Sequence, residues 1–187
     1  MGTNKNKDSF RFLHENPKLG KRIFIDVAAH VSGDVTLGDD ASIWPMVAIR
    51  GDVNCITIGA RSNIQDGCIL HVTHESAWQP EGRALDIGED VTVGHGAILH
   101  ACSIGDRCLI GMGAIVMDGA ILEPDSMVAG GAVVPPGKVV QSGTLWRGNP
   151  ARYARDLTER EIGNLLYSAQ HYVRLKDLYL EREGNND

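Results

Sequence analysis

Aromatic residues, long apolar runs and paired cysteines are all scarce in this chain of 187 residues. Phe, Trp and Tyr make up only 5% of it, and no apolar run approaches the ~18 residues that a membrane-spanning helix needs. The cysteines lack CxxC spacing, which argues against a thiolate zinc site or a disulfide framework. We therefore expect a cytoplasmic protein that contacts no membrane and whose cysteines are reduced and pack in the core. These cysteines are Cys55, Cys68, Cys102 and Cys108.

Basic patches are missing as well. The formal net charge is -6, and no block of about five or six like charges is present, which argues against nucleic acid as a partner. The opening residues, MGTNKNKDSF, contain no apolar stretch, so we expect no signal peptide. Glycine, in contrast, is abundant, with 22 residues. Much glycine with few aromatic residues favours a repetitive β architecture with a narrow core.

An aliphatic residue recurs every six positions through most of the chain. Three such hexads make one coil of ~18 residues in a parallel β-helix built from hexapeptide repeats. A β-sandwich, with strands spaced by about 8–12 residues, does not explain a fixed period of six. The sequence therefore predicts an all-β solenoid. The series runs through Ile25, Val31, Leu37, Ile43, Ile49 and Cys55, then Ile58, Ile64, Leu70, Ile87, Val93 and Leu99, and then Ile104, Ile110, Val116, Leu122, Val128, Val134 and Val140.

The repeat divides the chain into three segments. We expect a polar N-terminal segment over 1–20, the β-helix over 21–140, and a connecting stretch with a C-terminal α-helix over 141–187. Thr158 and Glu161 form a capping box at the start of this helix, and apolar residues follow at helical spacing. The helix covers either its own β-helix or a neighbouring subunit, and we expect the polar tail after Leu180 to fray.

One interruption of the repeat is an insertion. After Leu70, the series resumes at Ile87, which is 11 residues later than the period of six requires. The extra residues, 74–84, include Pro80 and Gly82, which favour a loop. We therefore expect this segment to leave the wall of the coil and return to it.

Removing the insertion brings two histidines together. His71 and His100 follow aliphatic residues that are then one coil apart, so they should stack on neighbouring strands about 4.8 Å apart. Two imidazoles at that spacing can share one zinc ion, with Zn–N distances near 2.1 Å. His95 begins more than ~10 Å away on the same coil. It can join the same ion only from a second copy of the chain in a rotationally symmetric assembly.

Three imidazole ligands would leave zinc with an open fourth position, which is the pattern of catalytic zinc sites. The alternative is that each histidine is an ordinary surface residue on a β wall. His74 fits a loop residue better than a fourth ligand. We assign no role to the remaining histidines, which are His14, His30 and His171.

Four motifs carry a resemblance to a known family. They are IRGD at 49–52, NIQD at 63–66, HVTH at 71–74 and GHGAILH at 94–100. With them, the chain resembles the γ-class carbonic anhydrases from about residue 22 to 180, and more closely the γ-carbonic-anhydrase-like bacterial proteins of the hexapeptide-repeat transferase superfamily. The resemblance implies a left-handed β-helix and a homotrimer with a His₃ metal site at each interface. The implied ion is Zn²⁺, with Fe²⁺ or Co²⁺ as alternatives.

The resemblance also implies roles for four other residues. Arg50, Asp52 and Asp66 match residues that form ion pairs and hydrogen bonds around the site and across the interface, and Gln65 matches a glutamine beside the metal-bound solvent. The alternative for the three charged residues is a role in assembly only. The implied reaction is the reversible hydration of CO₂ to bicarbonate by a metal-bound hydroxide.

The chain departs from the family pattern in its glutamates. Val53 stands where the best-studied member has a glutamate that passes protons to solvent, and the insertion offers only Glu75 and Glu81. Because fast hydration needs rapid proton export, we expect weak activity. Tyr167 matches a tyrosine that some relatives place near the site.

Two other functional classes stay open. One is a hexapeptide acyltransferase or a metal-dependent acyl-CoA thioesterase, and the other is a non-catalytic trimer stabilised by its metal. Acyltransferases of this fold typically use one catalytic histidine and no metal, so three histidines at ligand spacing argue against them.

Overall fold

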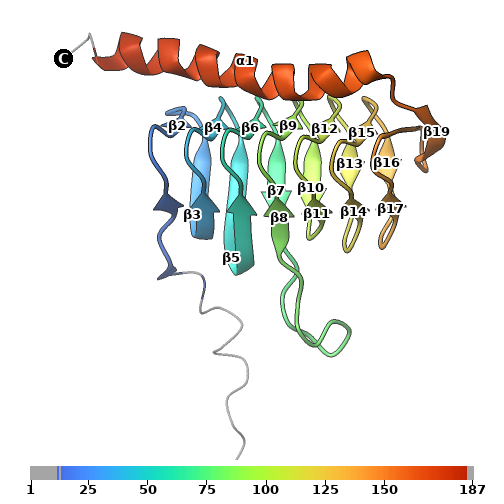
Figure 1. Ribbon diagram of the computed structural model, residues 1–187. Coiled ribbons are helices and arrows are strands. Elements are labelled where there is room, and N and C mark those ends of the chain that lie inside the picture. Colours follow the sequence, from blue (N-terminus) through green and yellow to red (C-terminus); the bar gives the residue numbers. More distant parts are fainter. Residues whose placement is uncertain (1–11, 13, 185–187) are drawn as a thin grey trace, which may run out of the picture.

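The computed structural model describes residue 12 and residues 14–184, and shows a left-handed parallel β-helix of about 7 turns with one long helix on its side (Figure 1). Most of the expected N-terminal segment and the last three residues lie outside the described part. Among the described residues, no helix is both long and apolar enough to cross a membrane.

The β-helix has three walls. Wall A contains the first halves of β3 (His30–Leu37) and β5 (Ala48–Ile58), followed by β7 (Ile69–His71), β10 (Ile98–His100), β13 (Ile115–Val116) and β16 (Val133–Val134). Wall B contains β1 (Lys18–Leu19), the second halves of β3 and β5, β8 (Leu85–Ile87), β11 (Ser103–Ile104), β14 (Ile121–Leu122) and β17 (Val139–Val140). The long strands β3 and β5 join walls A and B into one 11-stranded sheet.

Wall C is a separate 8-stranded sheet. It contains β2 (Phe24–Ile25), β4 (Ser42–Ile43), β6 (Asn63–Ile64), β9 (Thr92–Val93), β12 (Leu109–Ile110), β15 (Met127–Val128), β18 (Thr144–Arg147) and β19 (Arg152–Asp156). The strands of all three walls pair in parallel, except that β19 turns back along β18.

The aliphatic residues of the hexads fill the interior, as the repeat predicts. Most are fully buried, and small residues such as Cys68, Ala97 and Ala114 are buried at the corners. Ile25, Val31 and Cys55 are the members of the series that are only partly buried. Near Cys55, the register of β3 against β5 shifts between Gly33 and Val35. The fully packed position in this part of β5 is Ile56, while Cys55 is only half-buried.

The β-helix extends further at both ends than the repeat indicated. Strand β1 lies within the segment 1–20 and pairs with the end of β3. At the other end, Trp146 continues the period of six and pairs with Val128. The stretch after Val140 is therefore largely strand, and β18 and β19 close the last coil.

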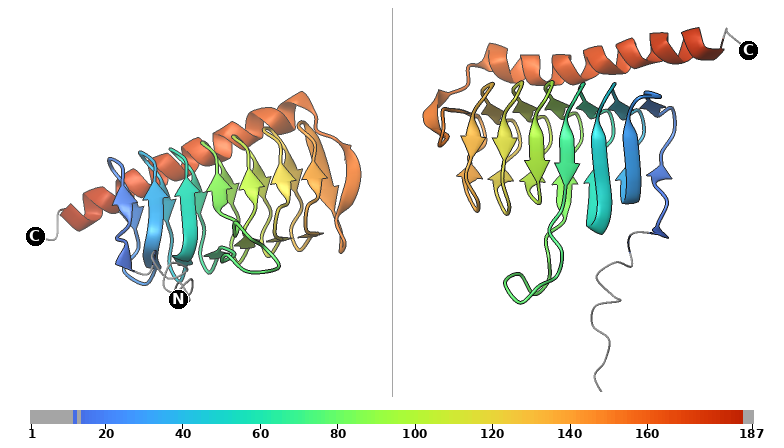
Figure 2. Two further views of the ribbon diagram at one scale, coloured as in Figure 1. Left: turned by 90° about the horizontal axis from the view of Figure 1, so that it is seen from below. Right: turned by 180° about the vertical axis from the view of Figure 1, so that it is seen from behind.

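The helix α1 (Glu159–Gly184) lies along wall C of its own chain, against β2, β4, β6 and β9 (Figures 1 and 2). The capping box forms as predicted: the Thr158 hydroxyl accepts from the Glu161 amide, and the Glu161 carboxylate accepts from the Thr158 amide. Trp44 anchors the other end of the helix, since its ring packs 5.4 Å from Tyr172 and 5.2 Å from Tyr179. The helix continues beyond Leu180, where the sequence predicted a frayed tail.

The insertion forms the predicted loop between β7 and β8 and projects beyond the coil (Figure 2). A single antiparallel bridge between Thr73 and Arg83 closes its base. Leu85 returns to the buried interior directly after the loop. The coil therefore continues after the loop, and Ile87 pairs with Ile58 of the preceding coil.

Candidate metal centre

His71 and His100 lie side by side at the ends of β7 and β10. These strands pair in parallel with His71 opposite His100, which confirms the stacking predicted from the insertion. The preceding residues, Leu70 and Leu99, are buried in the interior, so alternation along each strand points the two histidines outward.

The two rings face each other through one nitrogen each. Nδ1 of His71 lies 3.3 Å from Nε2 of His100. Two donors that are each 2.1 Å from a tetrahedral zinc ion lie about 3.4 Å apart. The pair therefore has the spacing of two ligands of one tetrahedral ion.

A carboxylate holds the other nitrogen of each ring. Nε2 of His71 donates to Oδ1 of Asp52 at 3.0 Å, and Nδ1 of His100 donates to Oδ1 of Asp118 at 2.7 Å. These bonds place the proton of each neutral imidazole on the carboxylate side and its lone pair on the facing nitrogen. Facing lone pairs repel unless a cation or proton lies between them, and metal-bound histidines commonly have such carboxylate partners. The donor set therefore fits zinc.

Both carboxylates are charged at neutral pH. Burial raises the pKa of Asp52, but hydrogen bonding with His71 and the charge of Arg50 outweigh burial, so the pKa lies below its ordinary value. Burial likewise raises the pKa of Asp118, and hydrogen bonds from Thr73 and His100 bring it below the ordinary value. Each carboxylate can therefore only accept hydrogen bonds.

His95 lies apart from this pair, in the turn between β9 and β10. Its Nδ1 is 2.9 Å from Oδ2 of Asp66, and both side chains are about half exposed. Within one chain, the described residues contain no group of three or more His, Cys, Asp or Glu side chains placed to hold a metal ion. The shared site of His71, His95 and His100 therefore stays a prediction that requires a second chain.

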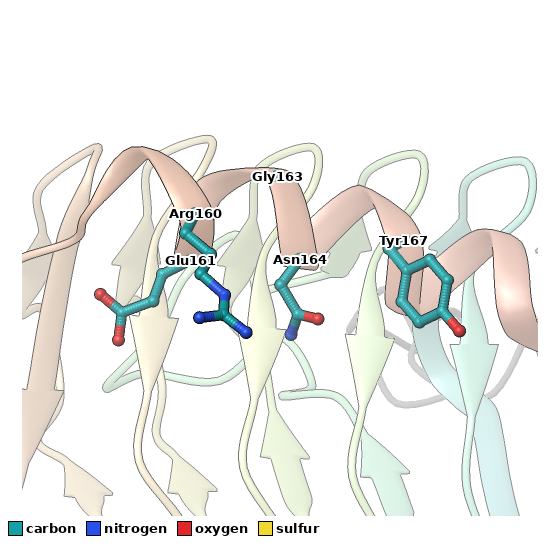
Figure 3. Close-up of a pocket in the computed structure, with 5 residues that line it drawn as sticks. All are labelled: Arg160, Glu161, Gly163, Asn164 and Tyr167. Carbon is teal, nitrogen blue, oxygen red and sulfur yellow. The ribbon is translucent and has the colours of Figure 1, made fainter.

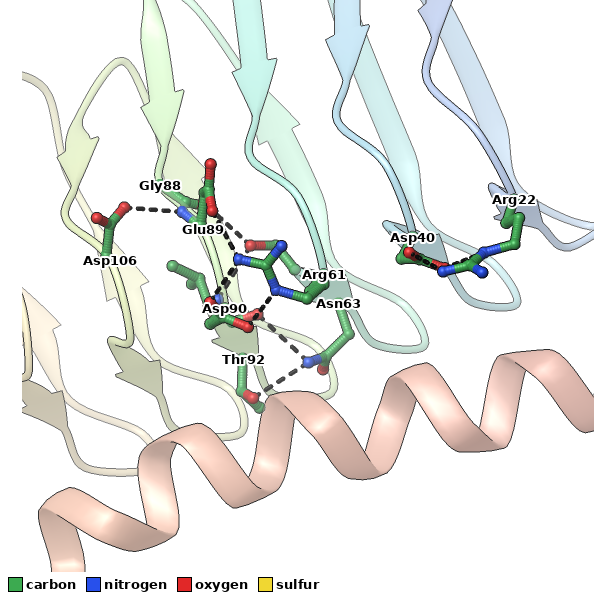
Figure 4. Close-up of polar contacts among 11 residues, drawn as sticks. Arg22, Asp40, Arg61, Asn63, Gly88, Glu89, Asp90, Thr92 and Asp106 are labelled. Atoms are coloured by element: carbon green, nitrogen blue, oxygen red, sulfur yellow. Dashed lines mark hydrogen bonds and ion pairs between the residues drawn. The ribbon is translucent and has the colours of Figure 1, made fainter.

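Gln65 belongs to the His95 side of the arrangement. Its Nε2 donates to Oδ1 of Asn63 at 3.1 Å, and its Oε1 accepts from the backbone amide of His95 at 3.2 Å. Asn63 in turn donates to Oγ1 of Thr92 (Figure 4). This buried network fixes the amide of Gln65 and leaves it one N–H and one lone pair for another partner.

The remaining residues of the resemblance have separate surroundings. Arg50 forms an ion pair with Asp52 and is half exposed. His74 is exposed in the loop. Tyr167 lines a surface hollow on α1 with Arg160, Glu161, Gly163 and Asn164 (Figure 3). Its ring stacks on His171 at 6.2 Å, so no described contact ties it to the histidine pair within one chain.

Asp118 was not among the residues predicted from the sequence. A signal was present, because Asp118 follows His100 by 18 residues, which is the length of one coil. Asp118 therefore stands directly above His100, as a search at that spacing would have indicated.

The sequence has relatives among curated proteins. It is 53% identical to Protein YrdA of Escherichia coli (strain K12), over 90% of this chain and 91% of that protein. It is 42% identical to a carbonic anhydrase of Geobacillus kaustophilus, over 91% and 90%. It is also 42% identical to Gamma carbonic anhydrase 1, mitochondrial, of Arabidopsis thaliana, over 85% of this chain and 58% of that protein.

The family model described as bacterial transferase hexapeptide (six repeats) matches residues 101–136. Among solved structures, a hexapeptide transferase family protein from Anaplasma phagocytophilum superimposes with a TM-score of 0.80 at 42% identity. That match covers 87% of this chain and 92% of the other. Protein YrdA has a name without a function, and the other matches are named either as carbonic anhydrases or as hexapeptide transferases.

Proposed function

The chain belongs to the γ carbonic anhydrase family of hexapeptide-repeat proteins, and from this premise we propose that it is a zinc-dependent enzyme that reversibly hydrates CO₂ to bicarbonate. The observation that carries the proposal is the pair of imidazole nitrogens 3.3 Å apart, each backed by a carboxylate. A pair arranged in this way suits a cation and has no evident use in packing.

We assign the ligands to His71 and His100 of one chain and His95 of a neighbouring chain. A zinc ion at this point would lower the pKa of water to about 7 and so supply a nucleophile for CO₂ at neutral pH. Fe²⁺ or Co²⁺ could take its place, since both accept imidazole ligands.

The surrounding residues orient these groups. Asp52 fixes the ring of His71, and Asp66 does the same for His95. Arg50 neutralises Asp52, which suits a partly buried junction between subunits. The buried amide of Gln65 is fixed by its own hydrogen bonds and presents its remaining N–H or lone pair to the attacking water.

The outer surface of wall A supports a trimeric assembly. Ile69, Ile98, Ile115 and Val133 alternate with buried residues and so project outward beside the histidines. Ile69 is exposed and the other three are partly exposed, and an apolar stripe of this kind beside a polar cluster is typical of a subunit interface. Packing this wall against a neighbour's His95 corner would cover the stripe and complete the site. We place this trimer in the cytoplasm, with CO₂ and bicarbonate as its small-molecule partners.

The test combines elemental analysis with stopped-flow CO₂ hydration on zinc-loaded protein. We expect about one zinc per chain and hydration above background. His100→Ala should lose both, while His14→Ala, which changes a histidine outside the site, should keep both. Zinc-loaded protein with no hydration above background would refute the activity.

An acyltransferase or acyl-CoA thioesterase is the second candidate, and the match to a hexapeptide transferase family protein favours it. Metal content separates the two readings. A chain that binds no zinc yet transfers an acyl group would support the transferase. Zinc without any activity, together with loss of the trimer in chelator, would instead support a metal-stabilised assembly.

A further inference from the structure

Asp118 uses both of its carboxylate oxygens near the histidine pair. It lies in the turn after β13, where Oδ1 accepts from Nδ1 of His100 at 2.7 Å and Oδ2 accepts from the hydroxyl of Thr73. A carboxylate held at both oxygens cannot rotate away from its partners. The direction of the His100 ring is therefore tied to Thr73 through Asp118.

Thr73 is itself fixed by the base of the insertion. Its backbone exchanges two hydrogen bonds with Arg83, at 3.0 Å and 2.9 Å. The guanidinium group of Arg83 lies against Gly119, where an added Cβ would come within 3.0 Å of Nη1. The closed base of the loop thus sits on the turn that carries Asp118.

We propose that Thr73 and Asp118 are positioning residues that hold His100 in the tautomer with its proton on Nδ1, and that the insertion 74–84 secures this pair. The proposal rests on the metal site proposed above. It gives the loop a role at the site through its base, where Arg83 pairs with Thr73 and lies against Gly119.

The tautomer of His100 affects metal binding because of the chemistry of imidazole. Neutral histidine has one protonated nitrogen and one lone pair, and either nitrogen can carry the proton. The lone pair has to be on Nε2, because Nε2 is the nitrogen that faces His71. Removing the partner that selects a ligand's tautomer typically weakens metal binding about 10–100-fold.

The first test is Co²⁺ titration of the metal-free, full-length protein. Asp118→Ala should raise the Kd for Co²⁺ about 10–100-fold. Thr73→Val should raise the Kd less, because Asp118 then keeps its hydrogen bond with His100 and loses only the one with Thr73. Asp86→Ala and Thr57→Val are matched controls, since both change exposed residues on wall B. The controls should bind Co²⁺ as the wild type does.

The second readout is ¹⁵N NMR of histidine-labelled, metal-free protein, with the His100 signals assigned from His100→Gln. Wild-type His100 should carry its proton on Nδ1, and Asp118→Ala should shift it toward Nε2. If Asp118→Ala does not fold, Asp118→Leu keeps a similar side-chain shape without any acceptor and should show the same direction of change.

The two readouts separate this proposal from the proposed function. An Asp118 variant that binds Co²⁺ like the wild type and keeps the proton on Nδ1 would overturn the positioning pair. A wild type that binds no Co²⁺ would instead refute the metal site, and the NMR spectra would still report whether Asp118 selects the tautomer.

Discussion

Lys176 carries a positive charge into the interface between α1 and wall C. Its side chain is fully buried, and Nζ lies 2.9 Å from Oδ1 of Asp40. Asp40 also receives two hydrogen bonds from Arg22, at 2.9 Å and 2.5 Å (Figure 4). The hydrogen bond with Arg22 lowers the pKa of Asp40 against the effect of burial, and Lys176 lowers it further. One carboxylate thus serves two cations. Lys176 also forms an ion pair with the half-exposed Asp177, so loss of Asp40 would leave the buried ammonium with one of its two carboxylate partners.

We expect Asp40→Asn to destabilise the protein by about 1–3 kcal/mol, because the buried ammonium of Lys176 loses one of its two carboxylate partners and Arg22 loses its ion pair. Lys176→Met should cost less, because Asp40 keeps Arg22. Urea denaturation at pH 7 measures both. Asp125→Asn is a matched control, since Asp125 also has a positive φ and pairs with an arginine 18 residues earlier, but at a more exposed position. It should cost at most about 1 kcal/mol.

The same pair predicts a pH dependence. Because the pKa of Asp40 is lower in the folded protein, its stabilisation is present above the unfolded value of about 3.9 and is lost as the pH falls through the folded value. The difference between wild type and Asp40→Asn should therefore shrink in acid. Equal stability of the two proteins at pH 7 would contradict this account.

One corner of the β-helix forms a ladder of alternating charges. Six residues stand on successive coils between walls B and C, and all have positive φ. They form three ion pairs along the ladder, and Figure 4 shows two of these pairs. Arg61 additionally reaches Glu89 at 2.6 Å. In chain order, the ladder is Arg22, Asp40, Arg61, Asp90, Arg107 and Asp125.

If the three ion pairs of the ladder are coupled, the stability of the folded protein should depend on the order of charges along it. Arg61→Asp should destabilise the protein by about 1 kcal/mol or more, since it places like charges beside Asp90. Adding Asp90→Arg restores opposite charges at positions 61 and 90. In this double variant, however, the acidic position 61 stands beside Asp40 and the basic position 90 stands beside Arg107. We therefore expect only partial recovery in thermal or urea denaturation. Full recovery would show that the three pairs are independent.

The sequence could predict the positions that follow from the period of six, but not those that depend on a register shift or on the packing of the helix against the coil. The period of six located the buried aliphatics, and subtraction of the insertion placed His71 beside His100. The half-burial of Cys55 depends on a register shift between β3 and β5, which the period does not encode. Asp118 follows His100 by the length of one coil and could have been found from the period, whereas the role of Lys176 depends on Asp40 of another element, which no sequence spacing indicates.

At the scale of the whole molecule, the proposed site is divided into two halves that one chain holds apart. His71 and His100 with their carboxylates lie at the edge of wall A, while His95 with Asp66 and Gln65 lies at the opposite corner of the same wall. A ring in which each chain presents one half to the next would contain as many complete sites as chains. Metal binding would then require the assembled oligomer, and the proposed activity would require the bound metal.

Metal content of mixed trimers tests this central claim most directly. Trimers of His95→Ala alone, or of the double variant His71→Ala/His100→Ala alone, should bind no zinc at the site. When the two are co-folded in equal amounts, each mixed trimer should regain one complete interface, or about one quarter of a zinc per chain overall. A His95→Ala trimer that keeps full zinc, or mixed trimers that regain none, would contradict a site shared between subunits.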